Sequence, residues 1–204
     1  MNKLFYILPS VIKNFVTSAI AIYKKHEKYG KLYKEYYRKL KNDNFKNSTY
    51  YLLEQFIEYS INNSEFYSTF DDTNIDTLPI LKKSDIIESN YSNIIGNPYK
   101  ITYSSGTTGQ PFKIPITKYA YQIEYAFWWY HRSFAGLKKG DKVASFAGHK
   151  VASIHSNKSP FWVYNYYDNQ IIFSSYHLSN ENLEYYIDEL NKFKPKLLHG
   201  YPSS

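Results

Sequence analysis

Residues 170–199 read QIIFSSYHLSNENLEYYIDELNKFKPKLLH, and this stretch predicts how the chain folds. Gln170 to Ser174 is a short apolar run typical of a buried strand. An apolar face with helical spacing follows over residues 183–190, with Ser179 as its N-cap and Pro195 at its end. Residues 196–199 predict a second short strand. Strand, helix and strand in this order indicate a parallel sheet and an α/β fold.

Neighbouring segments extend this pattern. Residues 142–147 predict a further strand, and residues 112–116 predict an edge strand, because Pro115 cannot donate to a ladder. Between them, a helix is expected from its N-cap Thr117 to about residue 135, with Gly136 just beyond its end. Apolar positions at helical spacing also predict N-terminal helices, whereas residues 62–78 read as a polar loop. We therefore expect a helical region, 1–62, and an α/β region, 63–204, whose mainly parallel sheet is incomplete.

The segment between the predicted helices and the sheet contains residue types that can bind an anion. It reads YSSGTTGQPFK over residues 103–113. Its glycines allow positive φ and close approach of the backbone to a ligand, and its hydroxyl and N–H groups can converge on an anion. Lys113 would add a positive charge. The segment is not a Walker A loop, because G-x-x-x-x-G-K-[ST] is absent.

Composition excludes several classes of protein. The chain of 204 residues is 43% hydrophobic and 20% aromatic, which is enough for a folded core. It has no cysteine, so disulfide scaffolds, zinc–thiolate sites and a cysteine nucleophile are excluded. His149, His155, His177 and His199 show no paired ligand spacing, so no metal site is expected. A Ser-His-Asp hydrolase is disfavoured, because the chain has no G-x-S-x-G elbow.

The positive charge lies at the N-terminus. Residues 1–46 hold 11 Lys/Arg and 3 Asp/Glu, whereas residues 47–204 hold 14 and 15. Helical spacing of Ile12, Phe15, Val16, Ala19 and Tyr23 predicts an amphipathic helix that packs on its own domain. An alternative is a helix lying on an anionic membrane, helped by the basic residues up to Lys46. A cytoplasmic protein is expected, peripheral at the inner face of the membrane in that alternative.

The loop resembles the phosphate loop of the adenylate-forming ligases, which reads roughly [ST]-S-G-[ST]-T-G-x-P. The match covers Ser104 to Gly109 and Pro111; the family's lysine directly follows the proline, whereas Phe112 precedes Lys113 here. Residues 78–85 resemble the segment before that loop in phenylacetate–CoA ligase relatives, and residues 135–142 resemble the turn that enters their next strand. Residues 174–179 and 194–203 are similar to the branch of capsular polysaccharide biosynthesis proteins called CapK. The resemblance covers nearly the whole chain.

This resemblance implies an N-terminal portion of the large, AMP-binding domain of such a ligase. In the family, a carboxylate attacks the α-phosphate of ATP, and coenzyme A or another acceptor then takes the acyl group. The expected ligands are ATP, Mg²⁺ and a small carboxylate, with coenzyme A as one acceptor. The residues that match the phosphate-binding motif, together with the nearby lysine, are Ser104, Ser105, Gly106, Thr107, Thr108, Gly109 and Lys113.

Three residues of the last third of the chain are candidates for a substrate pocket. His149, His199 and Tyr201 follow or end predicted strands, where substrates bind in open α/β sheets, and are candidates for the acyl pocket; a surface-loop role for His149 is the alternative.

The family's adenine-binding segment, ribose-binding aspartate and catalytic lysine have no counterpart here, so no catalytic residue is assigned. Because the sheet would end on an open edge near Ser204, we expect a fragment, a truncated product or a chain completed by another.

Two other functions remain open. A non-catalytic, membrane-docked protein in surface-polysaccharide assembly would use residues 1–46. The other is a nucleic-acid-binding module, because tyrosine and lysine are abundant and the N-terminal third of the chain is basic. No RNP-type, zinc-finger or helix-turn-helix pattern occurs, however, so no nucleic-acid partner is expected.

Overall fold

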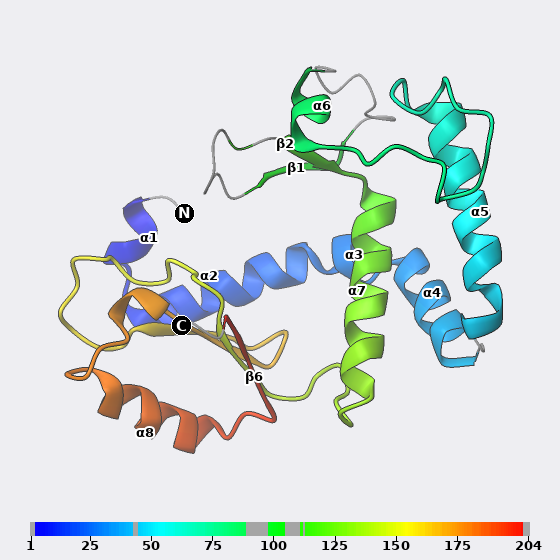
Figure 1. Ribbon diagram of the computed structural model, residues 1–204. Coiled ribbons are helices and arrows are strands. Elements are labelled where there is room, and N and C mark those ends of the chain that lie inside the picture. The colour runs from blue at the N-terminus through cyan, green and yellow to red at the C-terminus, as the bar shows by residue number, and fades with distance from the viewer. Residues whose placement is uncertain (1–2, 43–44, 89–97, 105–110, 112, 202–204) are drawn as a thin grey trace. The chain divides into compact units, whose positions relative to one another are not determined.

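The computed structural model describes residues 3–42, 45–88, 98–104, 111 and 113–201 (Figure 1). The helices and strands are, in chain order, α1 (Lys3–Ile7), α2 (Ser10–Tyr23), α3 (Lys25–Lys28), α4 (Lys31–Asn42), α5 (Phe45–Asn63), α6 (Lys83–Glu88), β1 (Lys100–Tyr103), β2 (Lys113–Ile116), α7 (Lys118–Ser133), β3 (Val143–Phe146), β4 (Trp162–Asn165), β5 (Gln170–Phe173), the 3₁₀ turn η1 (Ser175–His177), α8 (Leu183–Phe193) and β6 (Leu197–Gly200). The fold is thus mixed α/β, with a helical N-terminal half followed by a small sheet with helices.

The chain divides into two compact units. One unit comprises Tyr29–Phe127, and the other combines Met1–Lys28 with Trp128–Ser204. Helix α7 therefore begins in the first unit and ends in the second. Each unit is described by itself below.

In the unit of residues 29–127, tyrosines of α4 and its approach pack on α7. The rings of Tyr29 and Tyr125 meet edge to face with centroids 5.6 Å apart, and the hydroxyls of Tyr36 and Tyr119 hydrogen-bond. Such ring pairs add to the stability that burial of their area provides. Tyr29 and Tyr36 therefore serve as packing surface against α7.

The strands β1 and β2 form an antiparallel pair that precedes α7. Tyr103 is opposite Lys113 and Lys100 is opposite Ile116. The predicted edge strand at residues 112–116 is therefore confirmed, with a partner that the sequence did not indicate. Thr117 caps α7 as predicted, because its Oγ1 accepts the backbone N–H of Ala120 at 3.0 Å.

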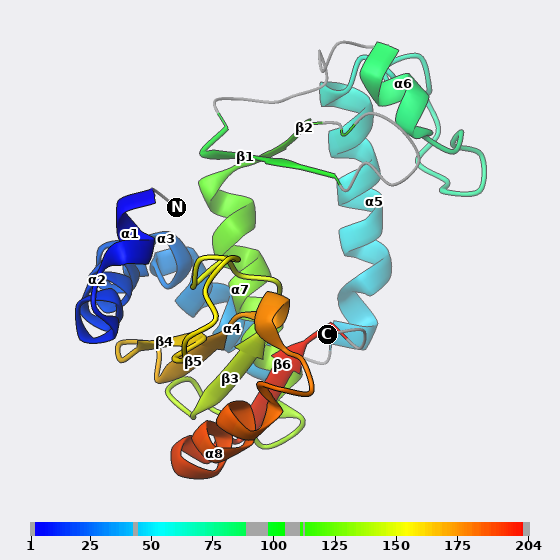
Figure 2. The same ribbon diagram turned by 90° about the vertical axis from the view of Figure 1, so that its left-hand side faces the viewer.

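The second unit contains a four-stranded sheet with the order β4-β5-β3-β6. Strand β3 is parallel to both β5 and β6, while β4 is antiparallel to β5. Figure 2 shows β6 beside β3 at one edge of this sheet. Since α8 connects β5 to β6 across β3, the predicted strand–helix–strand unit and mostly parallel sheet are confirmed.

The core of this unit lies between the sheet and α8. Phe161, Ile171, Phe173 and Tyr186 are each at most 1% exposed. The ring of Phe173 stacks on that of Phe146 with centroids 4.7 Å apart and on Tyr186 at 5.2 Å. The hydroxyl of Tyr186 donates to the carbonyl of Ser174 at 2.7 Å, which satisfies its buried polar end.

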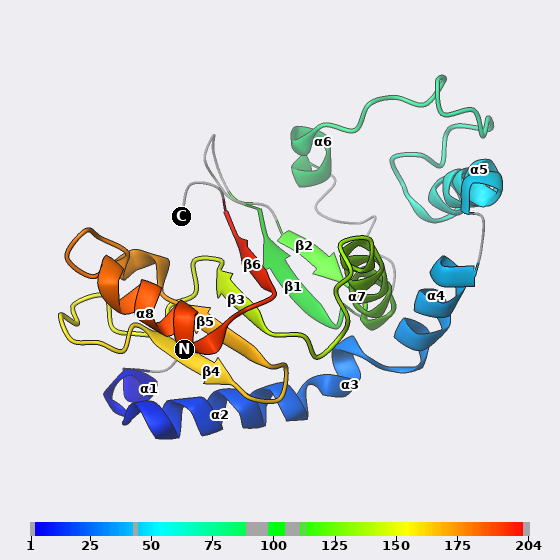
Figure 3. The ribbon, with the colours of Figure 1, turned by 90° about the horizontal axis from the view of Figure 1, so that it is seen from below.

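Helix α2 runs along the edge strand β4 (Figure 3), and its polar residues Asn14 and Ser18 contact the strand and the residue that follows it. The backbone N–H of Tyr164 donates to Asn14 Oδ1 at 2.8 Å, and that of Tyr166 donates to Ser18 Oγ at 2.9 Å. These bonds occupy edge N–H groups that would otherwise pair with another chain. The helix itself is confirmed, but the face with which it packs differs from the prediction.

Most of the predicted apolar face of α2 points to solvent. Phe15 is 64% exposed, Tyr23 81% and Ile12 45%. Val16 is the exception, because it packs against the small cluster around Phe5 and Val163. The helix therefore packs on its own domain, as predicted, but it does so mainly through its polar residues and not through most of this apolar face. In the described part of the chain, none of the helices combines the length and the hydropathy that a membrane span requires.

Candidate functional site

The loop of residues 104–112 joins two paired strands. Because Tyr103 and Lys113 are cross-strand partners, their Cα atoms are about 4.5–5.5 Å apart in such a ladder. Ser104, which follows β1, and Lys113, which begins β2, therefore stand at the mouth of the loop. Pro111 is exposed. The remaining motif residues, Ser105, Gly106, Thr107, Thr108 and Gly109, lie outside the described residues.

The hairpin that carries the loop is fastened to α7. The backbone N–H of Tyr99 donates to the carbonyl of Ile116 at 3.0 Å, which extends the ladder toward the helix. Lys100 Nζ lies 5.5 Å from the centre of the Tyr121 ring on α7, and the Tyr99 ring lies 6.1 Å from it. A loop whose two ends are held by a rigid scaffold is a frequent arrangement for binding.

The other candidate residues lie in the unit that contains the sheet. His149 follows β3, directly after Gly148, whose φ is +68°. His199 is the third residue of β6 and is opposite Ser145 of β3. Tyr201 follows β6 and is exposed. All three thus lie at or near the carboxyl ends of neighbouring parallel strands, where ligands bind in open α/β sheets.

A cavity of about 380 Å³ lies between β6 and α8. Its walls are mainly apolar side chains and include His199 and Tyr201; they are Phe146, Leu178, Leu183, Tyr186, Ile187, Leu190, Leu198, His199, Gly200 and Tyr201. The volume is near the lower limit of about 300 Å³ for ligand pockets. His199 and Tyr201 both line this cavity, whereas His149 does not, although it lies near enough to His199 for the two charges to interact.

The imidazole of His199 lies against α7. Its ring meets that of Trp128 edge to face with centroids 5.6 Å apart. Arg132, one turn further along α7, is 7% exposed, and its guanidinium carbon is 3.0 Å from the centre of the Trp128 ring. Sequence reasoning missed Arg132, although an arginine four residues after a tryptophan on a helix is the spacing that allows this stacking.

Both histidines of this region favour their neutral forms. Burial, and then the charges of Arg132 and His149, lowers the pKa of His199 from its ordinary value. Loss of water around the imidazole likewise lowers the pKa of His149, although the residue as a whole is exposed. A neutral imidazole can accept or donate a hydrogen bond at neutral pH.

We expect acidification to destabilise the fold through His199. Its folded pKa is lowered, so the unfolded chain binds more protons as the pH falls through about 6.5, and the free energy of unfolding decreases. His199→Gln should make urea-unfolding free energies measured at about pH 7.5 and pH 5.5 differ less than in the natural protein. The exposed His155→Gln is the control. An unchanged pH dependence in the His199 variant would contradict this assignment.

A serine–histidine pair elsewhere in the unit is structural. Ser174 Oγ and His177 Nδ1 are 2.8 Å apart, and His177 Nε2 lies 2.9 Å from the carbonyl oxygen of Ser153. Since a carbonyl only accepts, Nε2 carries the proton and Nδ1 accepts from Ser174. Ser174 is fully buried, and the Phe161 ring stacks on the imidazole at 4.8 Å. The pair therefore ties the loop before β4 to η1.

No cluster of three or more metal-ligating side chains occurs among the described residues. The hydroxyl-rich loop motif is a set of oxygen donors that suits Mg²⁺ only together with phosphate oxygens of a nucleotide. Any Mg²⁺ would thus be expected to accompany the nucleotide.

The chain was compared with known proteins. It is 32% identical over 217 aligned positions to Protein CapK of Staphylococcus aureus, and the alignment includes 98% of the chain. The chain is a homologue of Protein CapK. The resemblance to the CapK branch is therefore confirmed. The chain covers 48% of that protein, so it spans about half the length of this curated relative. No protein-family model matches the chain, and no solved structure matches it.

Proposed function

We propose that this chain contributes the phosphate-binding part of an ATP-dependent enzyme that activates a carboxylate as an acyl-adenylate. The main support is the paired hairpin β1–β2, which holds the two ends of the Gly/Ser/Thr-rich loop side by side. Homology to Protein CapK along nearly the whole chain adds to it. Since the chain spans about half of that relative, the complete reaction, its substrates and its acceptor are also part of the proposal.

The loop would bind the β- and γ-phosphates of ATP. The hydroxyls of Ser104, Ser105, Thr107 and Thr108 and the backbone N–H groups would donate to phosphate oxygens. Gly106 and Gly109 would let the backbone approach the phosphates closely. Lys113, on the strand opposite Tyr103, would add positive charge at the mouth of the loop. Mg²⁺ bound to the phosphates would neutralise further charge.

The reaction would then depend on position and charge. A carboxylate oxygen attacks the α-phosphorus of ATP, a phosphorus–oxygen bond forms, and pyrophosphate leaves with the electron pair of the broken bond. Donors fixed on the β- and γ-phosphates would stabilise the negative charge that develops on the leaving pyrophosphate. An acceptor such as coenzyme A would afterwards take the acyl group and release AMP. The apolar cavity between β6 and α8 is a candidate for the hydrocarbon part of the acid.

Binding of MgATP and of inorganic pyrophosphate to the purified chain tests the loop assignment. Both ligands carry two adjacent phosphates, so we expect them to bind in equilibrium dialysis and to compete with each other. AMP should compete poorly, because it lacks the β- and γ-phosphates. If neither ligand binds, the loop is not a phosphate site in this chain. Carboxylate activation itself would appear as carboxylate-dependent exchange of labelled pyrophosphate into ATP.

A second proposal concerns the membrane surface. Helices α1 and α2 expose a group of apolar side chains; they are Leu4, Ile7, Val11, Ile12, Phe15, Ile20, Ile22 and Tyr23. The polar residues of α2 already hold the sheet edge, so this apolar face is available for another surface. With 11 Lys/Arg against 3 Asp/Glu in residues 1–46, an anionic lipid surface is the complementary partner. Such an attachment would suit a role in surface-polysaccharide assembly, either alongside catalysis or without it.

Replacing Val11 and Phe15 by glutamine is expected to weaken binding to phosphatidylglycerol vesicles. Both side chains are more than 60% exposed, and burial of each in lipid is worth about 1.5–3 kcal/mol. Loss of both should lower the partition coefficient roughly 100-fold or more. Co-sedimentation with vesicles measures this effect. Phe56→Gln, an exposed aromatic on α5 outside the basic segment, is the control. Equal binding by the double variant and the control would contradict the proposal.

A further inference from the structure

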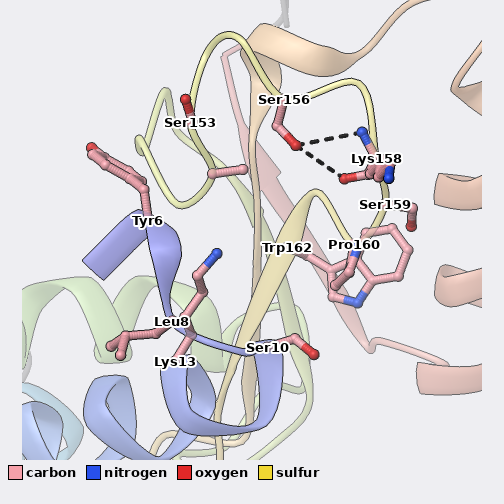
Figure 4. A pocket seen from close by; sticks show the side chains of 11 residues that line it. Tyr6, Leu8, Ser10, Lys13, Ser153, Ser156, Lys158, Ser159, Pro160 and Trp162 are labelled. Atoms are coloured by element: carbon pink, nitrogen blue, oxygen red, sulfur yellow. Dashed lines mark hydrogen bonds between the residues drawn. The ribbon is translucent and has the colours of Figure 1, made fainter. Parts of the chain in front are cut away.

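A second cavity lies at the β4 edge of the sheet unit, opposite the β6 edge, between the turn that joins α1 to α2 and the loop that joins β3 to β4. Its volume is about 210 Å³. Figure 4 shows Lys13 reaching into it from α2, Tyr6 on one side, and Pro160 and Trp162 on the other. We call it the Lys13 cavity. None of the histidines or loop residues of the candidate site belongs to its wall.

The charge of the Lys13 cavity is positive. Lys13 and Lys158 are its ionisable cations, and no aspartate or glutamate lines it among the described residues. Lys13 is partly buried, and loss of water lowers its pKa from the ordinary value. An anion beside the ammonium group would offset the cost of that lost hydration. The helix α2 also begins at Ser10 in this wall, and its positive end favours an anion as a minor contribution.

Serine hydroxyl groups share the wall of the cavity with the two lysines. Ser10, Ser153 and Ser159 lie in the wall. The hydroxyl of Ser153 accepts the backbone N–H of His155 at 3.4 Å, so its own hydrogen is a donor. Ser156 has a different role, because its hydroxyl accepts the N–H of Lys158 at 3.4 Å and donates to the Lys158 carbonyl at 3.2 Å (Figure 4). It therefore holds the backbone of Lys158 in place.

The far wall is fixed to the core of the unit. Val151 and Ala152, just before Ser153, are both 5% exposed. The carbonyl of Ser153 accepts from the buried His177 at 2.9 Å. A cavity built from fixed walls binds its ligand without first paying the cost of ordering them.

From these features we infer that the Lys13 cavity binds a phosphate group. Two ammonium groups and several hydroxyls supply more donors than the two oxygens of a carboxylate can use, whereas a phosphate group presents three or four acceptor oxygens. The volume is below the range of about 300–1,000 Å³ for larger ligands. The group could be carried by a small solute or by the headgroup of an anionic lipid, since the exposed apolar face of α2 begins beside the cavity.

The test uses the indole N–H of Trp162 as a reporter. In the ¹⁵N-labelled protein at constant ionic strength, inorganic phosphate should shift the Trp162 indole resonance saturably and leave those of Trp128 and Trp129 nearly unchanged. Lys13→Gln and Lys158→Gln should each weaken this binding about tenfold or more, because each removes a charge-assisted hydrogen bond. Lys150→Gln, an exposed lysine on the same loop that does not line the cavity, is the matched control.

Two further arms complete the test. Vesicles with and without phosphatidylglycerol distinguish a lipid headgroup from free phosphate; a lysine-dependent response to either source supports the inference. The Ser105→Ala, Thr108→Ala variant should keep the full Trp162 response, which separates this inference from the proposed ATP site. If Lys13→Gln does not fold, Lys158→Gln on the exposed loop carries the test. An unshifted Trp162 resonance, or equal affinity in the Lys13, Lys158 and Lys150 variants, would overturn the inference.

Discussion

Replacing Ser105 and Thr108 together by alanine is expected to weaken binding of MgATP and of pyrophosphate roughly 100-fold or more. Each hydroxyl would donate to a charged phosphate oxygen, and such hydrogen bonds are worth about 1.5–3 kcal/mol each. Every 1.4 kcal/mol or so changes a dissociation constant tenfold. Titration calorimetry on the natural and the doubly substituted chain measures the difference.

The matched control for this experiment is Ser68→Ala with Thr69→Ala. These residues are exposed and lie in the polar loop of residues 62–78. Their replacement by alanine also removes one serine and one threonine hydroxyl. The affinity of this control variant for MgATP and pyrophosphate should equal that of the natural chain. If the loop variant also binds like the natural chain, the hydroxyls of the motif do not contact the phosphates.

The second large effect is expected in the core of the sheet unit. Tyr186→Ala should lower the free energy of unfolding by about 3–5 kcal/mol, as truncation of a buried aromatic side chain does. Tyr186 is 1% exposed, stacks on Phe173 at 5.2 Å and donates to the Ser174 carbonyl at 2.7 Å. Urea unfolding followed by far-UV circular dichroism gives the value, and Tyr186→Phe isolates the loss of the hydrogen bond, expected at about 1 kcal/mol.

The neighbouring tyrosine on α8 provides the comparison. Tyr185 is 51% exposed, so Tyr185→Ala should change the free energy of unfolding by about 0.5 kcal/mol or less. Equal destabilisation by the two alanine variants would mean that α8 does not present this face to the sheet.

The sheet was the part of the fold that local pattern predicted best. Residues 170–199 combine an apolar run, a helical face and a second apolar run, and each of these features reflects burial on a particular side of an element. The start of the helix in this stretch differs from the prediction, however. The predicted N-cap Ser179 was wrong, because α8 begins only at Leu183 after Asn182.

Two strands were missed because their partners define them. Strand β1 exists through its pairing with β2, and strand β4 through its pairing with β5. The outward face of α2 was missed for a related reason. Periodicity identifies an apolar face, but it does not reveal that Asn14 and Ser18 on the other side would cover the edge of β4.

In the candidate sites too, local sequence features were predictable and contacts between distant segments were not. The loop motif was visible in the sequence, because order and residue type alone mark it, and the hairpin adds only the pairing of its ends. The cavities depend on residues far apart in the chain, such as Lys13 with Lys158 and Tyr186 with Tyr201. Arg132 lies in a helix rich in aromatic residues, so its stacking on Trp128 becomes evident only when the helix is built.

Amide resonances of the ¹⁵N-labelled chain, followed during titration with MgATP, would test the phosphate-loop assignment most directly. The assignment predicts saturable shifts of the amides of residues 104–109 and of Lys113, reproduced by pyrophosphate and lost when Ser105 and Thr108 are alanine. Saturable shifts found only elsewhere in the chain, or none at all, would contradict it.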